Sequence, residues 1–470
     1  MAIQLSESTE SLMQKVKGKV LRSGDQAYDE ARRIWNAMID RRPAAIVQCA
    51  DAEDVPNAIR FARDNGLEIS IRGGGHNIAG YSICDKGVMI DFSRMKNVRV
   101  DPKTRRAYVE PGATLHDFDQ AVQNHGLATP VGINSTTGIA GLTLGGGFGW
   151  LTRQYGMTID NLISADLVTA DLRKIRASEE TNQDLFWAIR GGGGNFGVVT
   201  QFEFKLHQLG PEILAGLIVF PFHQAKQVLL NYRHFVESAP LELNVWAVLR
   251  KAPPLPFLPV DVHGREVAIL AVFYSGDMRE GENLIRPLRY FGDPLGEHIG
   301  PQPYVQWEQA FDPLLTPGAR NYWKSHNFTQ LADGALDTMV AYAATMPSPQ
   351  CEIFVGLIAG AANRVPVNAT AYSGRDARFV MNVHGRWDNR SQDEECISWS
   401  REFFKVVAPY ASAGGYVNFM TEDESERVSA AYGPNYSRLL TIKQQYDPEN
   451  IFHLNQNINL GAIQETRQSR

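Results

Sequence analysis

The sequence predicts an α+β protein built in two parts. The chain opens with a short buried strand, a helix and a second strand within residues 44–72. Its 41 glycines are gathered largely in three runs, at 73–75, 145–149 and 191–197. After Gly210–Pro211, long strand-like stretches alternate with helical ones, which is typical of a domain built on an antiparallel sheet. A chain of 470 residues is long enough for two or three domains with sizeable cores.

In the first part, residues 44–49 and 68–72 form the opening strands, and Asp51 caps a helix that runs to Asn65. Thr114 starts another helix, which ends at Gly126. Apolar residues, turn residues and alternating polarity predict further strands at 88–92, 98–101, 106–110, 165–169, 174–177 and 198–206.

In the second part, strand-like stretches occupy residues 214–222, 266–274, 352–358 and 377–384. Helical stretches at 225–238 and 392–407 separate them, and a proline-rich loop lies at 253–259. A final segment contains a predicted helix at 425–445, followed by a tail whose partner the periodicity does not reveal.

Composition excludes several classes of partner. The net charge is −6 without long runs of one sign, so the sequence has no basic footprint for nucleic acid or anionic lipid. The longest apolar stretches, such as Val267–Tyr274, fall far below the roughly 18 residues of a membrane helix. The N-terminus lacks the apolar core of a signal peptide, so we expect a cytoplasmic protein with a small-molecule substrate.

Cysteine and histidine spacing predicts neither a disulfide framework nor a metal site. The four cysteines, Cys49, Cys84, Cys351 and Cys396, form no CxxC pair and are expected to be free and mostly buried. None of the 11 histidines has a partner at ligand spacing.

The third glycine run imitates a dinucleotide-binding fingerprint, since Gly192, Gly194 and Gly197 have the G-x-G-x-x-G spacing. That fingerprint requires a strand before the glycines and a helix after them. Here a helical stretch precedes the run and a strand follows it, so we do not expect a Rossmann site.

The first run, IRGGGHN, follows a strand directly, so bare backbone N–H groups could cradle an anion beside His76. The middle run, residues 143–150, again offers backbone without bulky side chains. Three separate cradles favour one extended, diphosphate-containing cofactor, and FAD fits best. Tight turns without any ligand are the alternative for each run taken alone.

Four ordered motifs between residues 36 and 460 strengthen this interpretation. They are IRGGGHN with Gly80-Tyr81, the stretch from PVGINSTTGIAG to YGMTIDNL, DLFWAIRGGGGNFGVVT, and YDPENIFHLNQNI. Together they resemble the berberine-bridge-enzyme-like FAD-linked oxidases of the vanillyl-alcohol oxidase superfamily, with most similarity to bacterial members of the hydroxynicotine-oxidase type. The resemblance implies a two-part FAD-binding domain, from residues 1–208 and 412–470, around an inserted substrate domain, 209–411, with an antiparallel sheet covered by helices.

The resemblance also implies how the cofactor is attached. His76 occupies the place of the histidine that binds the flavin covalently in this family, and Ala128 stands where some members have a second, cysteinyl attachment. Val131 retains the residue that leaves room for oxygen, which favours an oxidase over a dehydrogenase. The matching cofactor residues are Arg72, Gly73, Gly74, Gly75, His76, Asn77, Gly80, Tyr81, Pro130, Val131, Gly132, Thr136, Thr137, Gly138, Gly141, Gly145, Gly146, Gly147, Gly149, Trp150, Asp160, Asn161, Leu162, Gly193, Gly194, Asn195, Phe196, Gly197, Val198, Val199, Asn418, Asn455 and Asn457.

The implied chemistry is hydride transfer from a substrate C–H bond to the flavin, with a base that takes an O–H or N–H proton. Tyr322 and Lys324 are candidates because, two residues apart, they would share one face if the segment is a strand, although a solvated lysine on the strand face is the more common explanation of such a position. Further candidates are Glu352, Tyr416 and Asn418. Many relatives have a catalytic tyrosine in an NYxD motif where this chain has Phe419, so the resemblance does not carry over a tyrosine base. His384 is expected to be structural.

Three functions remain open from the sequence. The first is an oxidase of a small alcohol, amine or sugar-like substrate with oxygen as acceptor, which releases hydrogen peroxide. The second is a dehydrogenase with a different acceptor, and the third is a non-catalytic binding protein. Trp246, Trp307 and Trp323 would suit stacking on a substrate, and core packing explains them equally well.

Overall fold

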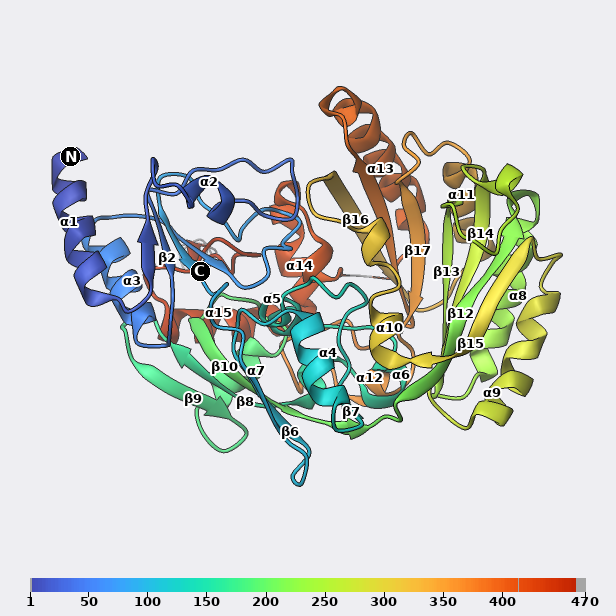
Figure 1. The fold of residues 1–470 in the computed structure, drawn as a ribbon, viewed down its shortest axis with the longest axis horizontal. Helices are drawn as coiled ribbons and strands as arrows, with labels where there is room; N and C mark the ends of the chain where they lie inside the picture. The colour runs from blue at the N-terminus through green and yellow to red at the C-terminus, as the bar shows by residue number, and fades with distance from the viewer. Residues whose placement is uncertain (1, 413, 462–470) are drawn as a thin grey trace, which may run out of the picture.

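The computed structural model describes residues 2–412 and 414–461, which form two halves with a cavity between them (Figure 1). The prediction of an α+β fold with an antiparallel sheet is confirmed. No helix among the described residues has the length and apolar character to cross a membrane.

The N-terminal half contains two sheets. In the first, β2, β4 and β3 are parallel and β1 pairs antiparallel with β2; its strands are β1 (Lys19–Leu21), β2 (Ala45–Gln48), β3 (Ile69–Arg72) and β4 (Val88–Asp91). The second is antiparallel, in the order β5-β6-β10-β8-β9; its strands are β5 (Val98–Asp101), β6 (Arg106–Val109), β8 (Leu162–Val168), β9 (Lys174–Ser178) and β10 (Val198–Lys205). A short antiparallel pair, β7 (Leu127–Ala128) and β11 (His207–Gln208), forms a separate two-stranded sheet.

Helices α1 (Ala2–Lys15), α3 (Asp54–Asp64), α4 (Leu115–Gln123) and α7 (Gln183–Ile189) of this half pack against its strands. Shorter helices are α2 (Tyr28–Ala31), α5 (Ile139–Leu144) and α6 (Thr152–Tyr155). Helix α4 begins with a capping box, in which the Thr114 side chain and Asp117 satisfy each other's backbone N–H groups. Helix α3 begins at Asp54 rather than at the predicted cap Asp51, whose carboxylate instead accepts from the N–H of Glu53.

The second half is one seven-stranded antiparallel sheet, in the order β15-β12-β14-β13-β17-β18-β16. Its strands are β12 (Glu212–Pro221), β13 (Leu243–Lys251), β14 (Glu266–Tyr274), β15 (Gly296–Pro303), β16 (Arg320–Phe328), β17 (Glu352–Leu357) and β18 (Phe379–Trp387). Helices α8 (Ala225–Ser238), α11 (Asp333–Ala343) and α13 (Asp393–Val407) pack on one face of the sheet. Shorter helices are α9 (Met278–Ile285), α10 (Tyr304–Glu308) and α12 (Ala361–Arg364).

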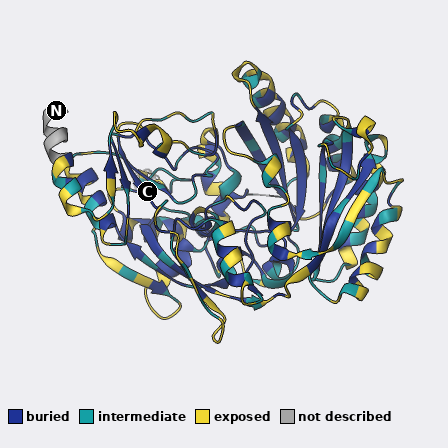
Figure 2. Cartoon of the chain, in the orientation of Figure 1, coloured by how far each residue is buried: buried dark blue, intermediate teal, exposed yellow. Residues whose placement is uncertain are grey.

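Apart from the edge strand β15, the strands of this sheet are largely buried, whereas β15 and the outer turns of the helices are exposed or half-buried (Figure 2). Burial of both sheet faces follows from the helices on one side and the N-terminal half on the other. All four cysteines are free and buried.

The C-terminal segment differs from the single helix predicted at 425–445. The structure has 3₁₀ turns at Val417–Phe419 and Glu422–Arg427, then α14 (Val428–Tyr432) and α15 (Tyr436–Tyr446). Gly433 has φ of +50° and is followed by Pro434, which together end α14. The buried Lys443 of α15 donates to the carbonyl oxygen of Asn195 at 2.8 Å and contacts Asp447 at 2.7 Å, which fixes this segment against the N-terminal half.

Candidate active site

A cavity of about 290 Å³ lies between the two halves, and three parts of the chain contribute to its wall. One end is lined by glycine-rich backbone of the N-terminal half and by residues 452–456 of the C-terminal segment. The other end is lined by aromatic side chains of the seven-stranded sheet and of residues 416–419. A cavity with one glycine-rich end and one aromatic end suits a ligand that has a polar, extended part and a reactive part that meets a substrate.

The first glycine run leaves the end of β3 and crosses the cavity wall. A Cβ atom at Gly74 would lie 2.3 Å from the backbone nitrogen of Gly138, and Gly75 has φ of +72°, so both positions require glycine. Within the described residues, the backbone N–H groups of Gly74, Gly75, His76 and Asn77 donate no hydrogen bond to other parts of the chain. They are therefore available to an anionic ligand in the cavity.

His76 lies at the end of this run and lines the cavity. Its Nε2 is 2.9 Å from the hydroxyl of Thr136, its Nδ1 is 3.4 Å from that of Thr137, and its ring stacks on Trp35 at 5.0 Å. Desolvation, and to a smaller extent the Arg386 guanidinium, lowers the pKa of His76 to about 3. The imidazole is therefore neutral at physiological pH and keeps a lone pair for bond formation.

Buried polar atoms without partners also mark the cofactor end of the cavity. Among the described residues, Ser82 Oγ, Tyr432 Oη and Asn455 Oδ1 make no hydrogen bond, and all three residues line the cavity. Gly141 and Gly194 face open space, since a Cβ atom there would meet nothing within 4 Å. The unpaired backbone N–H groups, the unpaired side-chain oxygens and the space beside these glycines together fit an FAD, which carries a diphosphate and ribityl hydroxyls.

The third glycine run contributes Gly193, Gly194 and Gly197 to the wall, and Val198 and Val199 follow at the start of β10. Helix α7 precedes the run and β10 follows it, so the expectation that this is no Rossmann turn is confirmed.

The middle run does not form the exposed cradle expected from its sequence. Of residues 145–149, only Phe148 lines the cavity. A Cβ atom at Gly145 would lie 2.2 Å from Oδ1 of Asn418, and one at Gly147 would lie 2.1 Å from the Thr158 hydroxyl. These glycines allow close packing behind the wall, and the backbone N–H of Gly147 donates to the Tyr416 hydroxyl at 3.0 Å.

About half of the predicted cofactor residues lie on the cavity wall: Gly73, Gly74, Gly75, His76, Asn77, Tyr81, Gly132, Thr137, Gly138, Gly141, Gly193, Gly194, Gly197, Val198, Val199, Asn418 and Asn455. The others do not line the cavity: Arg72, Gly80, Pro130, Val131, Thr136, Gly145, Gly146, Gly147, Gly149, Trp150, Asp160, Asn161, Leu162, Asn195, Phe196 and Asn457.

Several residues outside the wall have evident structural partners. Arg72 forms a bidentate pair with Asp91, at 2.9 and 2.7 Å, and Asp160 forms one with Arg375, at 2.8 and 2.7 Å. The Trp150 ring packs against Trp246 at 4.6 Å. These motif residues hold the wall in place rather than face the cavity.

Tyr416 and Asn418 occupy the boundary between the two ends of the cavity. The Tyr416 hydroxyl accepts from the N–H of Gly147 and from the Asn418 amide, each at 3.0 Å. Burial raises the pKa of Tyr416 to about 12, although these two hydrogen bonds oppose the shift. Tyr416 is therefore protonated at neutral pH and is suited to donate a hydrogen bond rather than to accept a proton.

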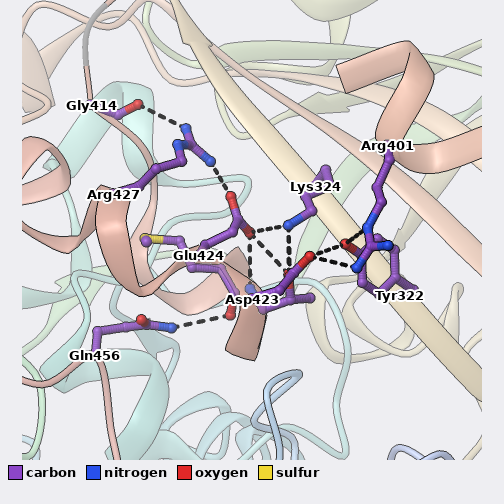
Figure 3. Close-up of polar contacts among 10 residues, drawn as sticks. Tyr322, Lys324, Arg401, Gly414, Asp423, Glu424, Arg427 and Gln456 are labelled. Atoms are coloured by element: carbon purple, nitrogen blue, oxygen red, sulfur yellow. Dashed lines mark hydrogen bonds and ion pairs between the residues drawn. The ribbon is translucent and has the colours of Figure 1, made fainter. Parts of the chain in front are cut away.

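Tyr322 and Lys324 do not line the cavity, so the structure corrects their assignment as candidate bases. They do share one face of β16, but that face packs against α13, and the cavity faces the intervening Trp323. Lys324 lies 2.9 Å from Asp423 and 3.1 Å from Glu424, and the Tyr322 hydroxyl donates to Asp423 at 2.6 Å (Figure 3). Arg401 of α13 completes the network, with contacts to both Tyr322 and Asp423 (Figure 3).

His384 was expected to be structural, but its ring lines the cavity and stacks on Trp323 at 4.4 Å. Glu352 is buried beside it, with Oε1 2.9 Å from His384 Nδ1 and Oε2 2.6 Å from Arg250. Desolvation alone would raise the pKa of Glu352, but Arg250 and His384 outweigh it and lower the pKa to about 2. Glu352 is therefore an anion with two partners, and the group next to the cavity is the histidine.

Aromatic residues form the rest of this end. Trp246 and Phe354 stack at 5.7 Å with an interplanar angle of 7°, and Phe419 meets Trp323 edge-on at 5.6 Å. Trp246 and Trp323 line the cavity as proposed for stacking, whereas Trp307 packs against Trp150 away from it. Sequence reasoning missed Trp35 and Phe354, since no motif surrounds either residue.

No group of His, Cys, Asp or Glu residues in 2–412 and 414–461 is arranged to hold a metal ion.

Comparison with known proteins agrees with this site. Two family models match the chain, one described as "FAD binding domain" over residues 43–178 and one as "Berberine and berberine like" over residues 415–459. The FAD-linked oxidoreductase YgaK of Bacillus subtilis is 30% identical over 454 residues, covering 94% of this chain and 97% of that protein. The (R)-6-hydroxynicotine oxidase of Paenarthrobacter nicotinovorans is 32% identical over 461 residues, covering 94% and 97%.

Solved structures show the same fold. The 6-hydroxy-D-nicotine oxidase of Arthrobacter nicotinovorans superposes with a TM-score of 0.85 at 28% identity, covering 94% of this chain and 98% of that one. The glucooligosaccharide oxidase of Acremonium strictum superposes with a TM-score of 0.86 at 22% identity, covering 96% and 99%. With identity of 30% or more to relatives matched over nearly their whole length, the chain belongs to the berberine-bridge-enzyme-like FAD-linked oxidoreductases and is an FAD-binding enzyme.

Proposed function

We propose that this enzyme is an oxidase whose FAD is covalently attached through His76 alone, and that it oxidises a small alcohol, amine or sugar-like molecule with oxygen as the final acceptor. The observation that carries the proposal is the position of a neutral His76 on the wall of a cavity built from glycine backbone. When bound, the flavin accepts a hydride from the substrate and passes the electrons to oxygen, which gives hydrogen peroxide.

A second, cysteinyl attachment has no support in this chain. Ala128 of β7 stands where the family's second anchor would be. The four cysteines are buried, and none of them lines the cavity. Burial raises the pKa of the Cys84 thiol to about 11, so the cysteine nearest to His76 in sequence is a poor nucleophile.

The residues that line each end of the cavity indicate which parts of the chain bind the cofactor and which bind the substrate. Residues 1–208 and 412–470 are proposed to form the FAD-binding domain, because residues 73–77, 193–199 and 452–456 line the same end of the cavity. Residues 209–411 are proposed to bind the substrate, because they supply Trp246, Trp323 and Phe354.

The residues of this chain bind and orient the substrate. The aromatic walls hold an apolar body, and the protonated Tyr416 hydroxyl, fixed by Gly147 and Asn418, donates a hydrogen bond into the boundary region.

The test combines intact mass with a substrate screen. The wild-type protein is expected to carry the mass of one flavin after denaturation, and the His76→Ala variant is expected to carry none. Screening alcohols, amines and sugars in air for peroxide should identify substrates. If reduction of the flavin by such a substrate proceeds but no peroxide forms, a dehydrogenase with another acceptor replaces the oxidase.

A further inference from the structure

Four residues form a row across four neighbouring strands on the cavity side of the large sheet. Trp323 of β16 pairs with His384 of β18, His384 pairs with Glu352 of β17, and Glu352 pairs with Arg250 of β13. Residues that pair directly across antiparallel strands project from the same face, so the four side chains lie side by side.

Within this row, His384 is held from both sides. Its ring stacks on Trp323 with an interplanar angle of 13°, and Nδ1 lies 2.9 Å from Oε1 of Glu352. Arg250 lies 2.6 Å from the other carboxylate oxygen. Side-chain exposure is 6% for His384, 12% for Glu352 and 9% for Arg250, so solvent does not compete for these contacts.

The second ring nitrogen of His384 has no partner. Both ring nitrogens are buried and neither makes a hydrogen bond of good geometry within the described residues, but Nδ1 lies 2.9 Å from the Glu352 carboxylate, whereas Nε2 has no such ion-pair contact, and the ring lines the cavity. A buried polar atom without a partner is rare and calls for a ligand or a water molecule. A carboxylate beside Nδ1 favours the proton on that nitrogen, which leaves the Nε2 lone pair as an acceptor.

The other candidate bases are less suitable. The Glu352 carboxylate is already shared between Arg250 and His384 and has a pKa lowered to about 2, after burial is outweighed by those two partners. The Tyr416 hydroxyl is protonated, since burial raises its pKa to about 12. Asn418 does not accept protons, and its amide already donates to Leu142 and to Tyr416.

We propose that His384 is the general base for substrate oxidation, held in place by Glu352 and Arg250, and that the substrate is an aromatic molecule with an O–H or N–H group on a side-chain carbon that also carries a hydrogen. The proposal rests on the proposed function for the electron acceptor. The substrate O–H or N–H proton moves to His384 Nε2 while the hydride leaves the adjacent carbon, with its electron pair, for the flavin. The substrate thus gains a C=O or C=N bond, and His384 later returns the proton to solvent.

The aromatic class follows from the walls around Nε2. Trp246, Trp323, Phe354 and Phe419 present ring faces and edges, which suit a flat ring. Of the polar side chains at this end, Asn134 Oδ1 already accepts from Thr136, and the Asn418 amide is occupied. A sugar has a hydroxyl on almost every carbon, and many of these hydroxyls would have no hydrogen-bond partner at the aromatic end of the cavity.

A binding experiment tests the base without turnover. The probe is 4-nitrophenol, a planar aromatic acid whose anion has a distinct yellow absorbance, added to the flavin-loaded enzyme below the pKa of the free phenol. We expect the wild type to bind the anion, so that the difference spectrum shows phenolate at a pH where free probe is protonated. His384→Gln should lose the phenolate signal, and Glu352→Gln should weaken it.

Rapid reduction of the flavin by a substrate from the peroxide screen supplies the second readout. His384→Gln should reduce this rate by about 10²–10⁴-fold and remove the acid limb of its pH profile. His326→Gln is the matched control, because His326 is buried on the same sheet but stacks on Phe404 and does not line the cavity. Intact flavin mass in each variant shows that the site is still assembled.

The outcomes separate the two proposals. A phenolate signal or an acid limb that persists in His384→Gln overturns the role of His384, and failure of the wild type to bind 4-nitrophenol overturns the aromatic class. Covalent flavin that persists in His76→Ala overturns the proposed attachment but leaves the phenolate readout intact.

Discussion

The buried polar groups on the two faces of strand β16 differ in whether their hydrogen-bonding atoms have partners within the protein. On the cavity face, Trp323 stacks on His384, whose Nε2 has no partner. On the other face, Lys324 Nζ donates to the Thr421 hydroxyl and pairs with the carboxylates of Asp423 and Glu424, the last two of which are labelled beside it in Figure 3. A buried polar group whose bonds are all made stabilises the fold, whereas one left unpaired is available to a ligand.

The largest effect is expected at Lys324, on the helix-covered face. Lys324→Met leaves the buried Glu424 and its neighbour Asp423 without their shared cation, and should lower the free energy of unfolding by about 3 kcal/mol. Denaturant unfolding measures the loss. Lys251→Met, which removes a more exposed lysine on the same sheet, is the control and should cost less than about 1 kcal/mol.

If Lys324 were instead a catalytic base, the folded Lys324→Met enzyme would lose flavin reduction and keep its stability. That pattern would contradict the assignment of the two faces.

The next effect is expected at Trp323, on the cavity face. Trp323→Ala removes the ring that stacks on His384 and lines the cavity, so we expect KM for an aromatic substrate to rise roughly tenfold. Steady-state kinetics measures it. An unchanged KM would show that the substrate does not contact this wall.

A pH-dependent effect is expected at Glu352. Its pKa is about 2 in the folded protein and about 4.5 in an unfolded chain, so the ionised form stabilises the fold above pH 4.5. This stabilisation is lost as the pH falls from 4.5 towards 2. Thermal unfolding of Glu352→Gln should therefore depend less on pH in this window than that of the wild type, and parallel curves would contradict the pairing with Arg250.

The smallest effect is expected at Tyr322, next to Lys324. Tyr322→Phe keeps the ring but removes the hydroxyl that donates to Asp423 and accepts from Arg401, which should cost about 1 kcal/mol of stability. Flavin reduction and its pH profile should match the wild type. A changed profile would place Tyr322 in the chemistry after all.

Local sequence patterns predicted the elements better than the site. Alternation within NYWKS correctly placed Tyr322 and Lys324 on one face, but alternation cannot reveal which face meets the cavity. The row of Trp323, His384 and Glu352 depends on pairing between strands far apart in sequence, and on the packing of helices against the sheet. Neither leaves a local signal.

The glycine runs show the same limit. The run before His76 follows a strand and does line the cavity, as its sequence indicates. The run at 145–149 looks equally open in sequence, yet its glycines are needed for contact with Asn418 and Thr158. A glycine leaves space where another residue would have a side chain. Tertiary packing decides whether a ligand or another part of the protein occupies that space.

The most direct test of the account is the site of flavin attachment. Trypsin should release residues 73–86 as one peptide, because Arg72 precedes it and Lys86 ends it. Fragment masses of the wild-type peptide are expected to place a single flavin on His76. A flavin on Cys84 of the same peptide, on another peptide, or wholly released on denaturation would contradict attachment through His76.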